Sequence, residues 1–441
     1  MLEEKPVKAI VRFSLPILFG LLFQQIYTTA DTAIVSRILG PEALAAVGCL
    51  NSVNFLILGF CNGMGSGFGI PIAQAFGANK SDDLKKYLGN MIWLYLLFSI
   101  VVTVISALLC NTILRVTNTQ DNIYTMAYIY MFTIFCGIPF QFGYNTMAGL
   151  LRSLGDSKNP LYILIFCSVL NIGLDLFMIC VLNWSVFGAA FATILSQGIS
   201  AIGCVIILIK NYPEYRIQKQ DLKISSKHMT SLLKNSIPMG FMMSVCGIGS
   251  LILQSSINTL GSSAIAAITA GEKIGQLLQS ITSSLGSSLT VFCGQNLGAG
   301  RVDRINEGVK GSVWIAMIFC FACIPIIFLF GKYLVYIFID SSNVELVNLT
   351  IQYLRILIIF FFGAGLIHTV RFALQGMGYP NVALIASILE MIARGVIGLF
   401  VIPSIGFMGA CFSNPLAWLM AIAYIIPMYF MTIKKLEKIH S

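Results

Sequence analysis

Residues 39–47 read LGPEALAAV, and 221 positions later residues 260–268 read LGSSAIAAI. Two further pairs of segments have the same offset: 73–80 (AQAFGANK) with 294–301 (GQNLGAGR), and 186–191 (VFGAAF) with 407–412 (FMGACF). Three matches at one spacing are the signature of an internal repeat, in which one structural unit occurs twice along the chain. The sequence therefore predicts two related halves.

The amino-acid composition excludes a water-soluble globular protein. Hydrophobic residues make up 57% of the chain and charged residues only 10%, whereas a protein dissolved in water needs a far more polar surface. Stretches long enough to cross the roughly 30 Å hydrocarbon core of a membrane occur at 11–36, 44–69, 88–110, 122–148, 161–182, 186–209, 232–258, 264–290, 309–331, 344–374, 381–402 and 407–432. The sequence predicts an all-α polytopic membrane protein with twelve transmembrane helices.

The basic residues predict how these helices are oriented. With the N-terminus in the cytoplasm, 21 of the 27 Lys and Arg residues fall on the inner side, Arg371 among them. Only Arg37, Arg115 and Lys332 fall on the outer side. Because basic residues concentrate in cytoplasmic loops, we expect a multi-pass protein of the cytoplasmic (inner) membrane with both termini inside. Topology also accounts for the net charge of +9, so no nucleic-acid partner is expected.

Each half contains six predicted helices, so both halves enter the membrane from the same side and form parallel repeats. We expect an N-lobe at residues 1–210 and a C-lobe at residues 231–441. Residues 211–230, which include Pro213 and several charges, are expected to form a cytoplasmic linker. Two such lobes are a recurrent transporter design, in which the substrate binds between lobes that rock against each other. The organisation therefore predicts a transporter.

Two acids in the first half, Asp31 and Asp175, fall inside predicted spans, where a charged group costs roughly 2.5–3.5 kcal/mol. Neither has a basic residue one helical turn away on its own span. Polar residues recur beside them at helical spacing: Gln24, Tyr27 and Thr28 on the first span, Asn171 on the fifth, and Thr193 and Gln197 on the sixth. If these faces converge, two carboxylates lie among amide and hydroxyl oxygens, an arrangement suited to a shared proton or a Na⁺ ion.

The alternative for Asp31 and Asp175 is that each is a hydrogen-bonded buried group that only helps helices to associate. Two acids of the second half, Glu272 and Glu390, carry a different expectation. Lys273 follows Glu272, and Arg394 lies four residues after Glu390, the favourable spacing for a helical ion pair. These charges either form structural ion pairs or line a cavity that binds charged substrates.

Several segments together resemble one known family over essentially the whole chain. They are Pro16, residues 24–31 (QQIYTTAD), residues 39–48 (LGPEALAAVG), residues 152–160 (RSLGDSKNP), and the pair Asn171 and Asp175. In this combination the sequence is similar to the multidrug and toxic compound extrusion (MATE) family. The resemblance implies export of cationic and amphipathic small molecules by antiport against H⁺ or Na⁺.

The resemblance also implies roles for individual residues. In family members with an acidic first lobe, the coupling-ion site matches Tyr27, Asp31, Asn171, Asp175 and Thr193. Bending of the first helix at the proline that matches Pro16 is a coupling motion proposed for the family, which makes Pro16 the expected hinge. Another branch of the family places its coupling acids in the seventh and tenth helices, where this chain has no acid well inside the span. We therefore place coupling in the first half.

The main rival function is a flippase for a lipid-linked oligosaccharide, a protein class that shares this superfamily's fold. Such proteins usually carry several cavity arginines, whereas this chain shows only Arg355 and Arg394 as candidates. An intramembrane enzyme is disfavoured because no HExxH or GxSxG motif occurs in a plausible context. We expect a monomer in the lipid bilayer that is not an enzyme and has no cofactor.

Overall fold

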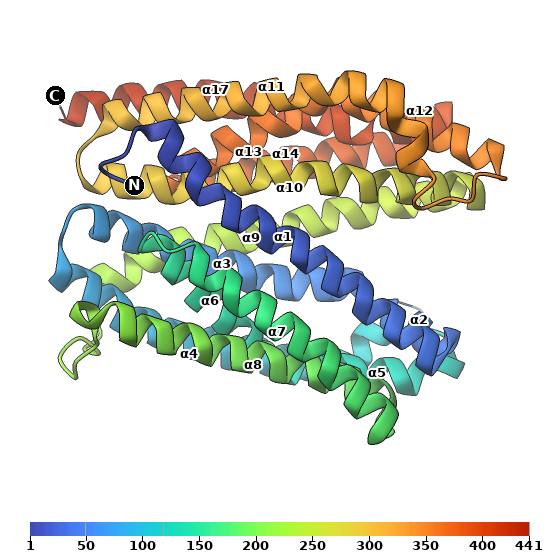
Figure 1. The fold of residues 1–441 in the computed structure, drawn as a ribbon, viewed down its shortest axis with the longest axis horizontal. Coiled ribbons are helices and arrows are strands. Elements are labelled where there is room, and N and C mark those ends of the chain that lie inside the picture. The colour runs from blue at the N-terminus through green and yellow to red at the C-terminus, as the bar shows by residue number, and fades with distance from the viewer. Residues whose placement is uncertain (49, 118, 441) are drawn as a thin grey trace. The chain divides into compact units, whose positions relative to one another are not determined.

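The computed structural model describes residues 1–48, 50–117 and 119–440, and these ranges contain helices and no strand. Figure 1 shows the long helices that result. The first half contains α1 (Pro6–Ile34), α2 (Pro41–Gly48), α3 (Asn51–Gly77), α4 (Ser81–Val116), α5 (Asp121–Cys136), α6 (Ile138–Ser153), α7 (Lys158–Leu176) and α8 (Ser185–Asn211). The second half contains α9 (Ser226–Ile257), α10 (Ser262–Gly298), α11 (Val302–Val335), α12 (Val344–Ile359), α13 (Phe361–Gly376), α14 (Pro380–Val396), α15 (Ile402–Ile405), α16 (Phe407–Cys411) and α17 (Ser413–His440).

The predicted class of all-helical polytopic membrane protein is confirmed. In the described ranges nine helices are long and apolar enough to cross a membrane, and two bent pairs raise the number to eleven. The bent pairs are α5 with α6, at 45°, and α12 with α13, at 47°. The remaining predicted span, 264–290, corresponds to α10, a continuous helix of 37 residues. It is less hydrophobic than the eleven spans counted above because many of its residues are Ser, Thr, Gly or Gln.

The backbone repeats with the same period as the sequence. Three pairs of residues with positive φ are each 221 positions apart: Gly40 with Gly261, Asn79 with Gly300, and Ser185 with Gly406. Five of these residues lie in a connection just before a helix begins, and Ser185 is the first residue of α8; the left-handed conformation turns the chain at each of them. The two halves therefore share their helix connections, and the two bent pairs are the fourth span of each half.

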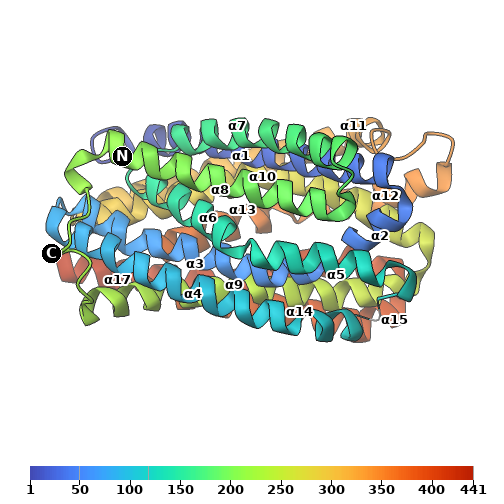
Figure 2. The ribbon, with the colours of Figure 1, turned by 90° about the horizontal axis from the view of Figure 1, so that it is seen from below.

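Contacts between Cα atoms divide the chain into two compact units. The N-unit consists of Phe19–Ser244, and the C-unit consists of Met1–Leu18 together with Val245–Ser441. In the N-unit α6 packs against α3, α4 and α8, and α8 also packs against α7. In the C-unit α13 packs against α10, α11 and α17. Figure 2 shows the helices of each unit running alongside one another.

Glycines allow the closest helix contacts in both units. In the N-unit a Cβ at Gly65 of α3 would lie 3.2 Å from the backbone nitrogen of Thr146 in α6. In the C-unit a Cβ at Gly286 of α10 would overlap the carbonyl oxygen of His368 in α13. Small residues permit such close approach in membranes, where lipid gives helices no hydrophobic reason to associate. Gly65 and Gly286 are again 221 positions apart.

Alanine at Gly286 is expected to destabilise the C-unit by about 1–3 kcal/mol, because the new methyl group must push apart two helix backbones. Thermal unfolding of the purified protein in detergent measures the effect. Gly395→Ala is the matched control, since a Cβ at this glycine of α14 meets nothing within 4 Å. An unchanged unfolding temperature in Gly286→Ala would contradict the packing described for α10 and α13.

Candidate ion-coupling site

The register of α1 on α7 brings the two predicted acids together. A Cβ at Gly20 of α1 would lie 3.5 Å from Cδ2 of Leu164 in α7, so the two helices touch there. Asp31 and Asp175 each follow their contact residue by eleven positions, about 16 Å along a helix. Because the two helices run in the same direction, the acids reach the same level. Their carboxyl groups lie within hydrogen-bonding range of each other.

In the acid pair Asp175 is buried and Asp31 is partly buried, and both are poorly satisfied by the rest of the protein. Asp175 is 0% exposed, and Asn171, one turn earlier on α7, is 4% exposed. One oxygen of Asp31, both oxygens of Asp175 and both polar atoms of the Asn171 amide have no hydrogen-bond partner in the described chain. Burying such groups unpaired costs free energy. Since a carboxylate has no donor of its own, a hydrogen bond between the two acids requires a proton.

Tyr27 lies next to this pair, as its spacing predicted. It is one turn before Asp31 on α1, and its side chain contacts Gln24 and Thr28. A further tyrosine, Tyr130 of α5, interacts electrostatically with both acids and is 9% exposed. No sequence pattern singles out Tyr130. This residue lies in a stretch of α5 that is rich in aromatic residues, where one tyrosine cannot be distinguished from another.

The two predicted residues of α8 have a weaker connection to the acids. The Thr193 hydroxyl donates to the carbonyl oxygen of Ala189 in its own helix, at 3.1 Å. The Gln197 amide oxygen is buried without a hydrogen-bond partner. Within the described ranges no hydrogen bond joins either residue to Asp31 or Asp175. The polar faces of α1 and α7 therefore converge, while α8 packs beside α7.

Pro16 lies inside α1, which continues as one helix through it from Pro6 to Ile34. It is fifteen residues before Asp31 and two residues before the end of the first segment of the C-unit, Leu18. Proline removes one backbone hydrogen bond from a helix interior and so weakens the helix locally. A weak point in α1 is therefore present close to the boundary between the compact units.

A π-helical turn directly follows each helix that supplies an acid of this pair. Residues Val35–Leu39 follow α1, and residues Phe177–Val181 follow α7. A third such turn, Ile397–Val401, follows α14, the helix that carries Glu390. Turns of this kind are rare and frequently occur at functional sites. Each turn changes the angular position of the residues that follow it around the helix axis, just beyond the acidic side chains.

The charges of the C-unit form an ion-pair cluster centred on Glu390. Arg371 of α13 donates from Nη1 to Oε1 of Glu390 at 2.9 Å, and Nη2 of Arg394 lies 3.9 Å from Oε2. Arg371, which was assigned to the inner side, lies near the end of α13 and is 9% exposed, so it is a buried partner of Glu390 rather than a solvated charge. Glu272 interacts electrostatically with Arg394, and its neighbour Lys273 is exposed.

Comparison with known proteins agrees with this architecture. A family model described as MatE matches residues 16–177 and 238–401. The chain is 29% identical over 373 residues to the probable multidrug resistance protein YpnP of Bacillus subtilis, an alignment that covers 84% of this chain and 82% of that protein. It is 28% identical over 338 residues to the probable multidrug resistance protein YoeA of the same organism, which covers 75% and 73% of the two chains.

A crystal structure of a MATE protein in a bent conformation superposes on this chain with a TM-score of 0.91. The two sequences are 25% identical, and the match covers 99% of this chain and 97% of the other. The family model alone accounts for well over half of the residues, in two segments that begin at Pro16 and at Pro238. The chain is thus a multi-pass membrane protein that belongs to the MatE family of transporters.

Proposed function

We propose that this protein is a secondary active antiporter that exports cationic or amphipathic small organic molecules in exchange for H⁺ or Na⁺. The observation that carries the proposal is the pair formed by Asp31 and Asp175, whose buried carboxyl groups face each other without a basic partner. Two carboxylates at hydrogen-bonding distance repel each other unless a cation lies between them. The names of the Bacillus subtilis relatives, probable multidrug resistance proteins, support the substrate class.

The atoms around the pair suit either coupling ion. Four carboxylate oxygens and the Asn171 amide oxygen are hard ligands of the type that alkali and alkaline-earth cations prefer. A single proton shared by the two acids satisfies the same site. In the described residues no group of three or more His, Cys, Asp or Glu side chains is arranged to hold a metal ion.

The transport cycle follows from the same proposal. Residues 1–210 and 231–441 act as lobes joined by the linker 211–230, with both termini in the cytoplasm and the protein acting as a monomer in the inner membrane. Uptake of an ion removes the repulsion between Asp31 and Asp175 and so favours one arrangement of α1 on α7. Loss of the ion restores the repulsion. The weak point at Pro16 allows the first part of α1 to respond.

Dye transport in proteoliposomes with an imposed pH or Na⁺ gradient tests this function. The purified protein is expected to use one of the two gradients to accumulate a fluorescent cation. That gradient should dissipate as the dye accumulates. Liposomes without protein and liposomes with Asp31→Asn are the controls. Transport that needs neither gradient, or translocation of a lipid-linked oligosaccharide without ion exchange, would show that the antiport proposal is wrong.

A further inference from the structure

A cavity of about 510 Å³ lies within the N-unit, away from the acid pair. Apolar side chains from three helices line most of it, including Ile92 of α4, Met147 of α6 and Ile209 of α8. Tyr212, Tyr215 and Arg216, from the turn that follows α8, close one end. Its volume falls in the range of small-molecule pockets, roughly 300–1,000 Å³. The cavity is therefore apolar along most of its length and polar at one end.

The polar end of the cavity lies where two membrane-spanning helices terminate. α4 begins at Ser81, α8 ends at Asn211, and the side chain of Tyr215 contacts Ser81. Tyrosines are typical of the membrane–water interface, where one end of the ring is apolar and the other is wet. The apolar part of the cavity consequently extends from this interface toward the interior of the membrane.

One cation lines the polar end, and a second lies one helical turn from the lining. Arg216 is exposed and contributes to the lining itself. Lys85 is partly buried on α4, three residues before the lining residue Leu88 and therefore on the same helix face. No acidic residue lines the cavity in the described chain, although Asp156 and Glu214 lie near Tyr212. Burial and these two charges raise the pKa of Tyr212 to about 12, so its phenol stays neutral.

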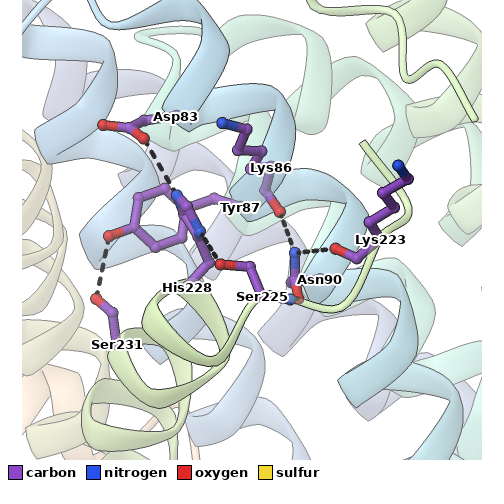
Figure 3. Close-up of polar contacts among 8 residues, drawn as sticks. All are labelled: Asp83, Lys86, Tyr87, Asn90, Lys223, Ser225, His228 and Ser231. Carbon is purple, nitrogen blue, oxygen red and sulfur yellow. Dashed lines mark hydrogen bonds and ion pairs between the residues drawn. The ribbon is translucent and has the colours of Figure 1, made fainter. Parts of the chain in front are cut away.

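The wall that carries Arg216 is held in place because the chain just beyond it is fastened to α4. Figure 3 shows this strap, residues 218–228, against α4. Asn90, which is 0% exposed, accepts from the backbone nitrogen of Ser225 at 2.9 Å and donates to the carbonyl oxygen of Lys223 at 3.3 Å. The indole nitrogen of Trp93 donates to the carbonyl oxygen of Leu222 at 2.9 Å. These bonds hold the backbone at Leu222, Lys223 and Ser225 against α4.

A buried histidine fastens the end of the strap. His228 is 4% exposed; its ring contacts Asp83 of α4 at 3.2 Å and the Ser225 hydroxyl at 2.7 Å. Tyr87 stacks edge-on against it, with ring centroids 4.7 Å apart. Tyr87 and Asn90 lie on one face of α4, and Leu88 and Ile92 lie on the adjoining face that lines the cavity. The cavity is thus preformed by a fixed segment.

We propose that this cavity binds an anionic phospholipid, with one acyl chain along the apolar wall and the phosphate at Lys85 and Arg216. A phospholipid matches the order of the lining, since it is apolar toward the membrane interior and negatively charged at the interface. Basic pockets between transmembrane helices are known to bind acidic headgroups. A cationic drug is disfavoured here because the one charge in the lining of the described chain, Arg216, is positive. The lipid would tie the strap to α4 and α8.

Native mass spectrometry of the full-length protein in detergent, titrated with phosphatidylglycerol or with phosphatidylcholine of the same chains, tests the proposal. Phosphatidylglycerol is expected to bind more tightly. Arg216→Gln is expected to weaken its binding about fivefold, the effect of about 1 kcal/mol per basic residue near a membrane surface. Lys219→Gln, an exposed residue of the same segment that does not line the cavity, is the matched control and should change nothing.

A second pair of variants tests the apolar part. Ile209→Trp places a large ring inside the cavity and is expected to weaken binding of both lipids at least tenfold. Ile206→Trp is its control, because Ile206 is exposed to the same degree, 46% against 45%, and does not line the cavity. Equal binding of the two lipids, or equal effects within either pair of variants, overturns the proposal. Displacement of phosphatidylglycerol by a transported dye also overturns it, because the cavity would then be a substrate pocket.

Discussion

Replacing either Asp31 or Asp175 by asparagine is expected to abolish efflux of a fluorescent cation from cells. Asparagine keeps the size and polarity of the side chain but can neither take up a proton nor neutralise a cation. The repulsion that we propose to drive the cycle then disappears. We expect the rate to fall by about a hundredfold or more, equivalent to about 2.7 kcal/mol in an activation barrier.

Expression and folding separate this loss from simple misfolding. Removing the charge from a buried acid without a basic partner should not destabilise the fold, so the amount of protein in the membrane is expected to stay at the wild-type level. Asp121→Asn, which changes an exposed acid at the start of α5, should transport normally. Wild-type efflux by both Asp31→Asn and Asp175→Asn would remove the acid pair from the mechanism.

Replacing Arg371 by methionine is expected to destabilise the protein by about 3–5 kcal/mol. The substitution leaves Glu390, which is 5% exposed, without the donor that lies 2.9 Å from it. Removing one partner of a buried ion pair costs this much because the other charge remains buried and uncompensated. Arg394, which lies 3.9 Å from the other carboxylate oxygen, remains as a second cation, so the loss is expected at the lower end of this range. Equilibrium unfolding in mixed micelles measures the effect.

A double variant identifies the cause of this destabilisation. Arg371→Met combined with Glu390→Leu removes both charges and is expected to recover at least half of the lost stability, because apolar replacement of a buried pair is often close to neutral. Arg115→Met alters an exposed arginine and should stay within about 0.5 kcal/mol of wild type. If the double variant is as unstable as Arg371→Met alone, the loss stems from packing.

The helical class and the repeat could be predicted from the sequence, which also singled out the two acids, and each inference had a physical reason. Lipid requires long apolar stretches, so spans are conspicuous, and an unpaired acid within such a stretch stands out. Asp31 and Asp175 were recognisable because each has polar residues one turn away. Their common level on α1 and α7 depends on a contact at Gly20, which no single-sequence pattern reveals.

The ends and breaks of helices were predicted less well. The stretch 88–110 is only the apolar middle of α4, which extends from Ser81 to Val116 because polar residues continue the helix beyond the hydrocarbon region. The stretch 44–69 corresponds to two helices, α2 and α3. The sequence placed Arg371 on the inner side but did not reveal its partner Glu390, which lies 19 residues later on another helix. Such pairings depend on tertiary structure.

The left-handed residues that recur every 221 positions show that the chain is a duplicated scaffold, yet its chemistry is not duplicated. The positions that correspond to Asp31 and Asp175 at this offset are Ile252 and Val396. One copy has a pair of acids where the other has two branched aliphatic side chains. If the acid pair is the coupling site, as we propose, a symmetric frame with a single such pair limits the stoichiometry: each turnover exchanges only the one or two charges that these carboxylates carry.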